Sequence, residues 1–411
     1  MDAFISALQN VIAIDSSTKQ GAVECLHYVL DMAEKMGLRT GNLDDMVGWA
    51  EYGEGEEMVA VLGHLDVVPV GDGWTKPPFG GVIEDGRLYG RGAIDDKGPI
   101  LAALFALDAL RREGFRPRRR VRVLFGTEEE TGTADMTYYV NNGGELPVLG
   151  FTPDGSYPLI HGEKGLLVEE YVCDCDSGPI LRAWSGTAAN IVPDKAWAEL
   201  ADGRRIECRG VAAHGAEPWK GENAAGKLLA ELARLPLTGK LAEAVAFLHG
   251  RIGMETKGES LGVYLEDEIS GPLSFNLGML RLDASGLRVT VNYRYPVTCR
   301  FEDCVPQVRA AFAQAGFRLA SASHSEKLYV PEDAPLVRKL IGVYNAYTGE
   351  NARPICIGGG TYAKSMPNIL AFGPAFPGEE ATEHQPDEYI DLERLRQCYD
   401  MTRLAILALS E

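Results

Sequence analysis

Met58-Val59-Ala60-Val61-Leu62-Gly63-His64-Leu65-Asp66 is the stretch that constrains the fold more than any other part of the chain. Its first part, Met58–Leu62, is an unbroken apolar run of the kind that forms a strand buried on both faces of a sheet. The run closes in Gly63-His64-Leu65-Asp66, so an imidazole and a carboxylate come directly after it. The stretch therefore predicts a buried strand with potential metal ligands at its carboxyl end.

The same order of strand and acidic side chain recurs twice further along the chain. The strand-like segment Val121–Phe125 precedes Glu128-Glu129-Glu130, and Val148–Phe151 precedes Asp154. A strongly apolar helix opened by Pro99 lies between the first two strands, and this alternation predicts an α/β domain with a mostly parallel sheet. In such sheets ligands bind beyond the carboxyl ends of the strands, so we expect these side chains to meet at one edge.

Further donors of the same type stand in Asp95-Asp96 and in Glu383-His384-Gln385-Pro386. Ligands of this kind, drawn from widely separated segments, suit a dinuclear metal centre that activates water. In Asp95-Asp96, one carboxylate could bridge two cations while the other orders the loop or the helix start; helix capping alone is the alternative. Asp66 could accept the second ring N–H of His64 and fix its tautomer, or it could be a solvated turn residue.

The run Glu128-Glu129-Glu130 places three carboxylates side by side, which repel one another unless cations are close. Neighbours in extended backbone point to opposite sides, so Glu129 and Glu130 could divide two roles between them. One would ligate metal, and the other would take a proton from the attacking water. The alternative is a solvated acidic face.

The pattern of predicted strands and helices changes near Leu166. Strand-like segments such as Leu166–Val172, Ala196–Leu200 and Leu287–Tyr295 alternate with a helical stretch over 224–235, which indicates an α+β domain. Long helices return after Pro331, and this last part carries His384, so it must fold back onto the first part. We therefore predict a catalytic domain made of residues 1–165 and 330–411, with a second domain, residues 166–329, inserted between them.

The bulk composition excludes several classes of protein. A chain of 411 residues is longer than a domain with a single hydrophobic core usually is, which agrees with two domains. Its formal net charge of -19 argues against a nucleic-acid partner, and no stretch approaches the roughly 20 apolar residues of a membrane span. The eight cysteines are dispersed, and the N-terminus resembles a starting helix rather than a signal peptide, so we expect a cytoplasmic protein with reduced thiols.

Three further candidates are weak when taken singly. Gly358-Gly359-Gly360-Thr361 follows a strand-like segment and lets backbone approach a ligand closely, or it is a plain turn. Arg294 lies in a strand-like segment and could be an ordinary surface arginine. His214, in a loop of small residues, is by itself better explained as a structural histidine.

Taken together, these motifs resemble those of the dinuclear zinc exopeptidase and deacylase family. This family includes bacterial dipeptidases of the PepV type, aminoacylases, succinyl-diaminopimelate desuccinylases and glutamate carboxypeptidases. The segments that carry the resemblance, in the family's order, are Gly63–Pro69, Gly90–Gly92, Asp95–Gly98, Thr127–Gly132, Pro153-Asp154 and His384–Pro386. The segments that look most like PepV-type dipeptidases are Gly162–Gly165, Asn292–Pro296 and Gly358–Ala363.

The resemblance implies a zinc-exopeptidase catalytic domain with an inserted lid and two divalent metal ions. Zinc is the first expectation, and manganese or cobalt is the alternative. Asp95 would bridge the two ions. His64 and Asp154 would complete one metal site, and Glu130 and His384 the other.

The resemblance also assigns roles in catalysis and substrate binding. Glu129 would be the general base, Asp66 the partner of His64, and His214 the lid residue that stabilises the oxyanion. Arg294 would hold the free carboxylate of the substrate. The other residues implied to line the substrate site are Asn190, Gly358 and Gly359.

We therefore expect a metallodipeptidase that hydrolyses unblocked dipeptides with a free C-terminal carboxylate. One alternative is an N-acyl-amino-acid amidohydrolase of the aminoacylase or desuccinylase type. An alternative from another class is a catalytically silent protein that binds a small molecule or peptide on the same fold. The expected partner is a small peptide, and an inserted segment longer than a minimal dimerising lid favours a monomer over a homodimer.

Overall fold

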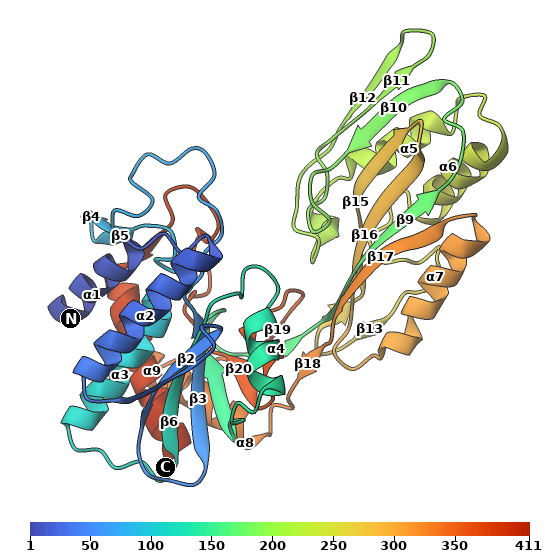
Figure 1. The fold of residues 1–411 in the computed structure, drawn as a ribbon. Coiled ribbons are helices and arrows are strands. Elements are labelled where there is room, and N and C mark those ends of the chain that lie inside the picture. The colour runs from blue at the N-terminus through green and yellow to red at the C-terminus, as the bar shows by residue number, and fades with distance from the viewer. The chain divides into compact units, whose positions relative to one another are not determined.

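The computed structural model describes all 411 residues, which form two compact units (Figure 1). The first unit comprises Met1–His161, Val330–Ile355 and Thr361–Glu411, and the second comprises Gly162–Tyr329 and Cys356–Gly360. Compared with the predicted division at residues 165 and 330, the second unit begins earlier, at Gly162. It also takes in Cys356–Gly360, which we had assigned to the catalytic domain.

The first unit alternates helices and strands. Its elements are α1 (Asp2–Ile12), α2 (Lys19–Lys35), β1 (Arg39–Leu43), β2 (Val47–Tyr52), β3 (Met58–His64), β4 (Val82–Glu84), β5 (Arg87–Tyr89), α3 (Lys97–Arg112), β6 (Arg120–Gly126), α4 (Ala134–Asn141), β7 (Leu149–Thr152), β8 (Ile160–Glu163), α8 (Pro335–Thr348), the 3-10 helix η3 (Tyr362–Ser365), β20 (Ile369–Ala371), β21 (Tyr389–Asp391) and α9 (Leu392–Ser410). The last two residues of β8 already belong to the second unit.

The main sheet of this unit has the strand order β1-β2-β6-β3-β7-β20-β8. The central pairs β6–β3, β3–β7 and β7–β20 are parallel. The pairs β1–β2, β2–β6 and β20–β8 are antiparallel and lie toward the edges. The predicted α/β fold is confirmed, with the parallel strands gathered at the centre of the sheet.

Strand β3 lies in the middle of this sheet, and every one of its residues is buried. Helices cover both faces of it. A Cβ atom at Gly63 would lie 2.8 Å from Ile100 of α3, whereas one at Gly126, which pairs with His64, would meet Tyr362 and Asp135. Since successive residues of a strand face opposite sides, α3 covers one face of the sheet, and η3 and α4 cover the other.

The second unit is an α+β structure. Its elements are β9 (Gly165–Cys173), β10 (Ile180–Ser185), β11 (Lys195–Leu200), β12 (Arg205–Arg209), η1 (Pro218–Lys220), α5 (Ala224–Leu232), α6 (Gly239–Arg251), β13 (Glu266–Asp267), β14 (Gly271–Pro272), β15 (Ser274–Asp283), β16 (Gly286–Tyr295), η2 (Phe301–Asp303), α7 (Val305–Gln314), β17 (Arg318–Ser325) and β18 (Leu328–Tyr329), and β19 (Ile355–Ile357) ends in it. Its sheet is antiparallel, in the order β12-β11-β10-β15-β16-β9-β17. The helices pack their apolar faces on this sheet, where Phe312 of α7 stacks on Tyr171 with ring centroids 3.8 Å apart.

Some elements differ from the sequence prediction. The hairpin of β1 and β2 was not predicted, because β1 has no buried residue and therefore no apolar pattern. Gly41 is needed where it stands, since a Cβ atom there would lie 2.1 Å from the ring of Trp49. Helix α3 begins at Lys97, two residues before the predicted start at Pro99, and Pro99 lies within its first turn, where it is tolerated.

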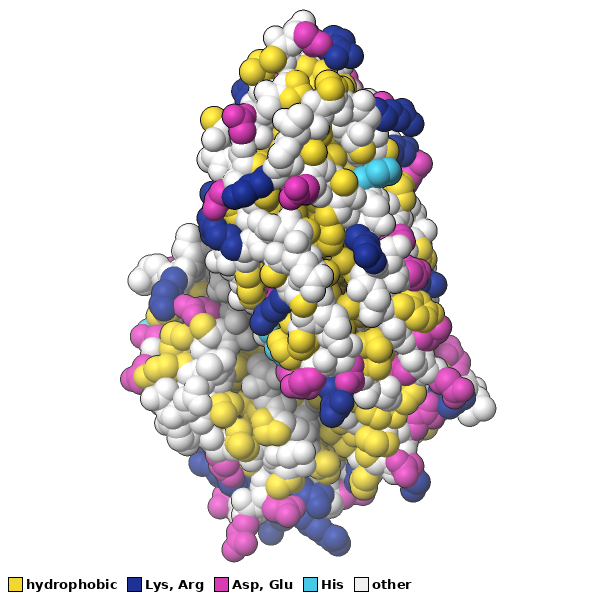
Figure 2. Space-filling view, turned by 90° about the vertical axis from the view of Figure 1, so that its right-hand side faces the viewer, with side chains coloured by type: hydrophobic (Ala, Val, Ile, Leu, Met, Phe, Trp, Pro, Cys, Tyr) yellow, Lys and Arg dark blue, Asp and Glu magenta, His cyan; other side chains and the backbone are white.

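No helix has the length and apolar character needed to cross a membrane. All eight cysteines are free. On the face shown in Figure 2, acidic and basic side chains are interspersed, without a large area of either charge.

Candidate active site

Three neighbouring parallel strands end where the predicted ligands begin. Strand β3 ends at His64, β6 ends at Gly126 shortly before Glu129 and Glu130, and β7 ends at Thr152 shortly before Asp154. These strands are adjacent in the order β6-β3-β7 and run in the same direction. The fold therefore brings the three strand ends to one edge of the sheet, as the sequence predicted.

Asp95 lies between two imidazoles. Its Oδ1 is 3.1 Å from Nε2 of His64, and its Oδ2 is 3.0 Å from Nε2 of His384. Glu130 Oε1 is 3.1 Å from the same His384 nitrogen. Burial alone would raise the pKa of Asp95, but the hydrogen bonds to His384 and His64 outweigh it and lower the pKa. The bonds to Asp95 and Glu130 raise the pKa of His384 to about 10.

The donor set fits a metal ion. Ligand atoms of His64, Asp95 and Glu130 lie within 4.8 Å of one another. Burial and the charge of Asp95 raise the pKa of Asp154 to about 7. Burial and neighbouring carboxylates, Asp154 first among them, raise the pKa of Glu129 well above its usual value. Carboxylates gathered in this way are stabilised in their charged form by bound cations, and imidazole with carboxylate suits zinc, manganese or cobalt.

Glu129 and Glu130 lie in a turn, so the prediction of extended backbone here was wrong. Strand β6 ends at Gly126, and the turn is closed by hydrogen bonds from Gly132 N to Glu129 O at 3.0 Å and from Thr133 N to Glu128 O at 2.9 Å. The two side chains still have different neighbours. Glu130 contacts His384, whereas the charged groups with the largest effect on Glu129 are Asp154 and His64.

Asp66 contacts both His64 and the turn of the two glutamates. Nδ1 of His64 donates to the backbone O of Asp66 at 3.0 Å, and the nearer carboxylate oxygen is 3.4 Å away. The Asp66 carboxylate accepts hydrogen bonds from Glu129 N at 3.2 Å and Glu130 N at 3.1 Å. Asp66 therefore links the ends of β3 and β6, a contact that sequence reasoning missed.

Asp96 is fully buried and serves a different purpose from Asp95. It occupies the N-cap position of α3, yet its side chain makes no capping hydrogen bond. Instead its Oδ2 accepts a hydrogen bond from the backbone N of His64 at 3.3 Å. Of the two alternatives that the sequence left open, the structure supports ordering of the loop over helix capping alone.

A buried carboxylate that sequence reasoning missed supports this edge of the sheet. Asp135 Oδ2 accepts hydrogen bonds from Thr127 N at 2.7 Å, from Glu128 N at 2.8 Å and from the Tyr362 hydroxyl at 2.5 Å. The backbone N of Tyr362 donates to Asp154 Oδ2 at 3.3 Å. The only signal in the sequence was the position of Tyr362 directly after the Gly358–Thr361 run.

The predicted substrate residue Arg294 lies on β16 in the second unit, and its side chain is 2% exposed. Its Nη1 donates to the Gly358 carbonyl at 2.7 Å, while Nε and Nη2 donate to Asn292 Oδ1 at 3.3 and 3.2 Å. Burial lowers the pKa of Arg294 to about 10. A buried cation whose partners here are neutral oxygens is suited to receive an anionic ligand.

His214 and Asn190 lie on neighbouring backbone segments of the same unit. Gly215 N donates to the Asn190 carbonyl at 2.7 Å, and His214 forms an isolated bridge with Ile191. Burial and the charge of Arg294 lower the pKa of His214, which favours its neutral form. The unit thus brings together Asn190, His214, Arg294 and Gly358, and Gly359 follows in the same loop.

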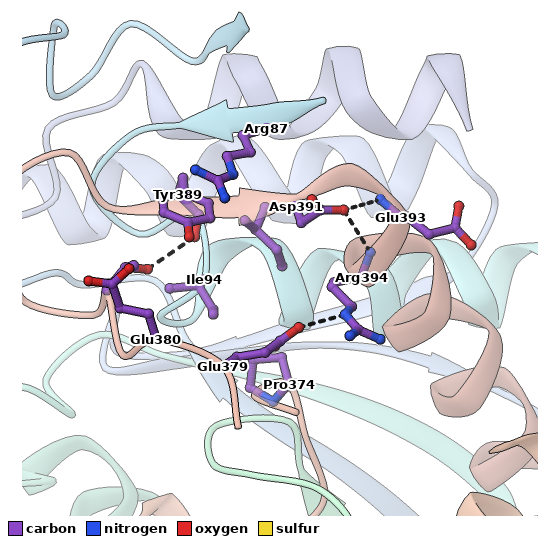
Figure 3. Close-up of a pocket in the computed structure, with 11 residues that line it drawn as sticks. Arg87, Ile94, Pro374, Glu379, Glu380, Tyr389, Asp391, Glu393 and Arg394 are labelled. Atoms are coloured by element: carbon purple, nitrogen blue, oxygen red, sulfur yellow. Dashed lines mark hydrogen bonds and ion pairs between the residues drawn. The ribbon is translucent and has the colours of Figure 1, made fainter. Parts of the chain in front are cut away.

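A cavity of about 460 Å³ lies elsewhere in the first unit, beside β21 and the start of α9 (Figure 3). Ile94 lines it, but none of the predicted ligands does. Several of its charged side chains already have partners in the protein. Arg394 contacts Glu379 at 2.5 Å, and Asp391 accepts a hydrogen bond from Glu393 N at 2.9 Å. The chemistry therefore belongs to the sheet edge and not to this cavity.

An α/β sheet with imidazoles and carboxylates gathered at the carboxyl ends of its parallel strands is the architecture of a metal-dependent hydrolase. Over residues 60–408 the chain matches the family described as Peptidase family M20/M25/M40. The chain therefore belongs to this family and is a peptide-bond hydrolase of a metal-dependent family, which confirms the predicted family and enzyme class.

Individual relatives agree with this assignment. The chain is 36% identical over 429 residues to "Putative dipeptidase YtjP" of Bacillus subtilis (strain 168). The alignment covers 95% of this chain and 91% of that protein. The M20 family metallo-carboxypeptidase Sso-CP2 from Sulfolobus solfataricus has a similar fold, with a TM-score of 0.65 at 17% identity over 100% of both chains. The YXEP protein of Bacillus subtilis, described as a dinuclear metal binding peptidase, has a TM-score of 0.57 at 13% identity over 100% of both chains.

Proposed function

We propose that the chain hydrolyses dipeptides with a free C-terminal carboxylate at a centre of two divalent metal ions. The observation that carries the proposal is the position of Asp95, whose two carboxylate oxygens face different imidazoles at 3.1 and 3.0 Å. His64 and Asp154 would hold one ion with Asp95, and Glu130 and His384 the other. The name of the Bacillus subtilis relative, a dipeptidase, supports this substrate class.

Bound metal ions would supply a polarised peptide carbonyl and an acidified water molecule. Glu129 would take the proton of that water and return it to the leaving nitrogen, because it lies near His64 and Asp154 whereas Glu130 contacts His384. Asp66 would hold the His64 ring and the backbone of Glu129 and Glu130 in place through the contacts described above.

The second unit would bind and polarise the same substrate. His214 in its neutral form would donate a hydrogen bond to the carbonyl oxygen as negative charge develops there. Arg294 would bind the terminal carboxylate, and Asn190, Gly358 and Gly359 would line the substrate site. Zinc is the proposed metal, with manganese or cobalt as alternatives that the same donors accept.

The test is a panel of dipeptides and matched N-acyl amino acids, assayed after chelation and reconstitution with zinc, manganese or cobalt in turn. We expect dipeptide turnover with two metal equivalents bound. Turnover of N-acyl amino acids alone would identify an amidohydrolase of the aminoacylase or desuccinylase type. Absence of any turnover by the fully loaded protein would favour a binding protein and refute the proposal.

A further inference from the structure

A buried ion pair joins the segment that carries Asp95 to the segment that carries His384. Arg91 Nη1 lies 2.7 Å from Glu388 Oε2, and the two side chains are 2% and 1% exposed. The two residues are 297 positions apart in the sequence, yet both lie in the first unit. A buried pair of charges is costly unless further hydrogen bonds satisfy it, so its other contacts indicate its role.

Glu388 holds the backbone of Asp95. Its second carboxylate oxygen, Oε1, accepts hydrogen bonds from Ile94 N at 3.2 Å and from Asp95 N at 3.4 Å. Its own backbone O accepts a hydrogen bond from Gly90 N at 2.9 Å. One side chain, four positions after His384, thus fixes the loop from which the bridging carboxylate projects.

Arg91 makes the reciprocal contact. Its Nη1 donates to the carbonyl of Gln385, the residue after His384, at 3.3 Å. Its guanidinium also lies over the ring of Trp74, 5.1 Å from the ring centroid. The segment that carries His384 has no regular structure between β20 and β21, so this pair is an important constraint on where that imidazole lies.

We propose that Arg91 and Glu388 are positioning residues that set the separation of Asp95 and His384. The inference rests on the proposed function, in which Asp95 and His384 ligate the same ion. It adds that this ion depends on the contact between Arg91 and Glu388. Both ions share Asp95, but the ion held by His64 and Asp154 has its other two ligands on β3 and after β7, where the sheet fixes them. The ion held by His384 depends on the pair at two of its ligands, Asp95 and His384, so loss of the pair weakens that ion more than the other.

The experiment titrates metal-free protein with Co²⁺, following heat and the Co²⁺ absorption spectrum, and needs no substrate. The first variant is Glu388→Gln, which removes the charge but keeps the size of the side chain. The second combines Arg91→Met with Glu388→Met, which leaves no unpaired buried charge and should therefore fold. The matched control is Glu51→Gln, which breaks another buried contact of the first unit, with Arg122 Nε at 2.8 Å.

We expect the parent protein to bind two equivalents of Co²⁺, and Glu51→Gln to bind each equivalent with the same affinity as the parent. Both Glu388 variants should bind the second equivalent at least about 10-fold more weakly than the parent, the scale for losing a residue that orients a metal ligand, and the first equivalent with a smaller loss. Parent-like binding of both equivalents by the double variant, or equal weakening of both, would overturn the inference. A parent protein that binds only one equivalent would instead overturn the two-metal proposal, and this inference with it.

Discussion

Arg294→Met is expected to lower kcat/KM for dipeptides with a free carboxylate by about 10²- to 10⁴-fold, and to abolish the preference for that carboxylate. Methionine fills much of the same volume and removes every donor. The substitution therefore tests whether the guanidinium recognises the substrate's terminal charge, which is the main argument for a dipeptidase over other hydrolases on this fold.

The magnitude follows from counting donors. A guanidinium has five N–H groups, and Asn292 Oδ1 and the Gly358 carbonyl occupy three of those of Arg294. The remaining two are one on each terminal nitrogen, so both terminal nitrogens keep a donor for a carboxylate. A hydrogen bond to a charged group contributes about 1.5–3 kcal/mol, so losing two corresponds to the range given above.

The assay compares the free acid and the C-terminal amide of one dipeptide on parent and variant enzyme. In the parent, amidation should cost about as much as the substitution does on the free acid. In the variant, amidation should change kcat/KM little, because the recognising group is already absent. Arg281→Met is the matched control, since Arg281 also donates to backbone carbonyls, among them Gly186 at 2.6 Å.

Full additivity of the two losses would refute the reasoning. It would mean that Arg294 and the carboxylate affect catalysis independently and do not contact each other. An equal effect of Arg281→Met on amide discrimination would also count against it, because the loss would then reflect the sheet of the second unit rather than one guanidinium.

Three further substitutions test the remaining roles. Glu129→Gln should abolish hydrolysis and leave two metal equivalents bound, as elemental analysis can show; loss of one equivalent would mean that Glu129 and Glu130 have exchanged roles. His214→Ala should lower kcat by about 10²-fold without changing metal content, the scale for losing one oxyanion donor, and an unchanged kcat would remove it from the mechanism. Asp66→Ala should weaken metal binding by about 10- to 100-fold, since Glu129 N and Glu130 N lose their acceptor; parent-like affinity in a Co²⁺ titration would contradict this.

The sequence was sufficient for the elements that are buried on both faces. Strand β3 has an unbroken apolar run, and β6 is apolar from Val121 to Phe125 except at Arg122; such runs are typical of strands buried on both faces and are visible without any structure. Their parallel arrangement followed from the intervening helix. The hairpin of β1 and β2 was missed because one of its strands, Arg39–Leu43, has no buried residue and hence no apolar signature.

The contacts between ligands were less predictable, because they depend on long-range hydrogen bonds to backbone. That Asp66 would accept from Glu129 N and Glu130 N depends on the pairing of β3 with β6, and no local pattern encodes which carboxylate satisfies a distant turn. Glu388 is a similar case, since its partners Ile94 and Asp95 are contributed by a segment from the other end of the chain. Residue type suggested the candidate ligands, but not the residues that hold them in place.

Asp95 and Asp96 show how one glycine separates two identical side chains into different roles. A Cβ atom at Gly63 would lie 2.2 Å from Asp96 Oδ2, so only glycine lets this carboxylate reach the backbone N of His64. With Asp96 held against the end of β3, Asp95 is the member of the pair whose oxygens face His64 and His384. The glycine that precedes His64 therefore matters through its missing side chain, which allows Asp96 to bind the His64 backbone and leaves Asp95 as the carboxylate that we propose to bridge the two ions.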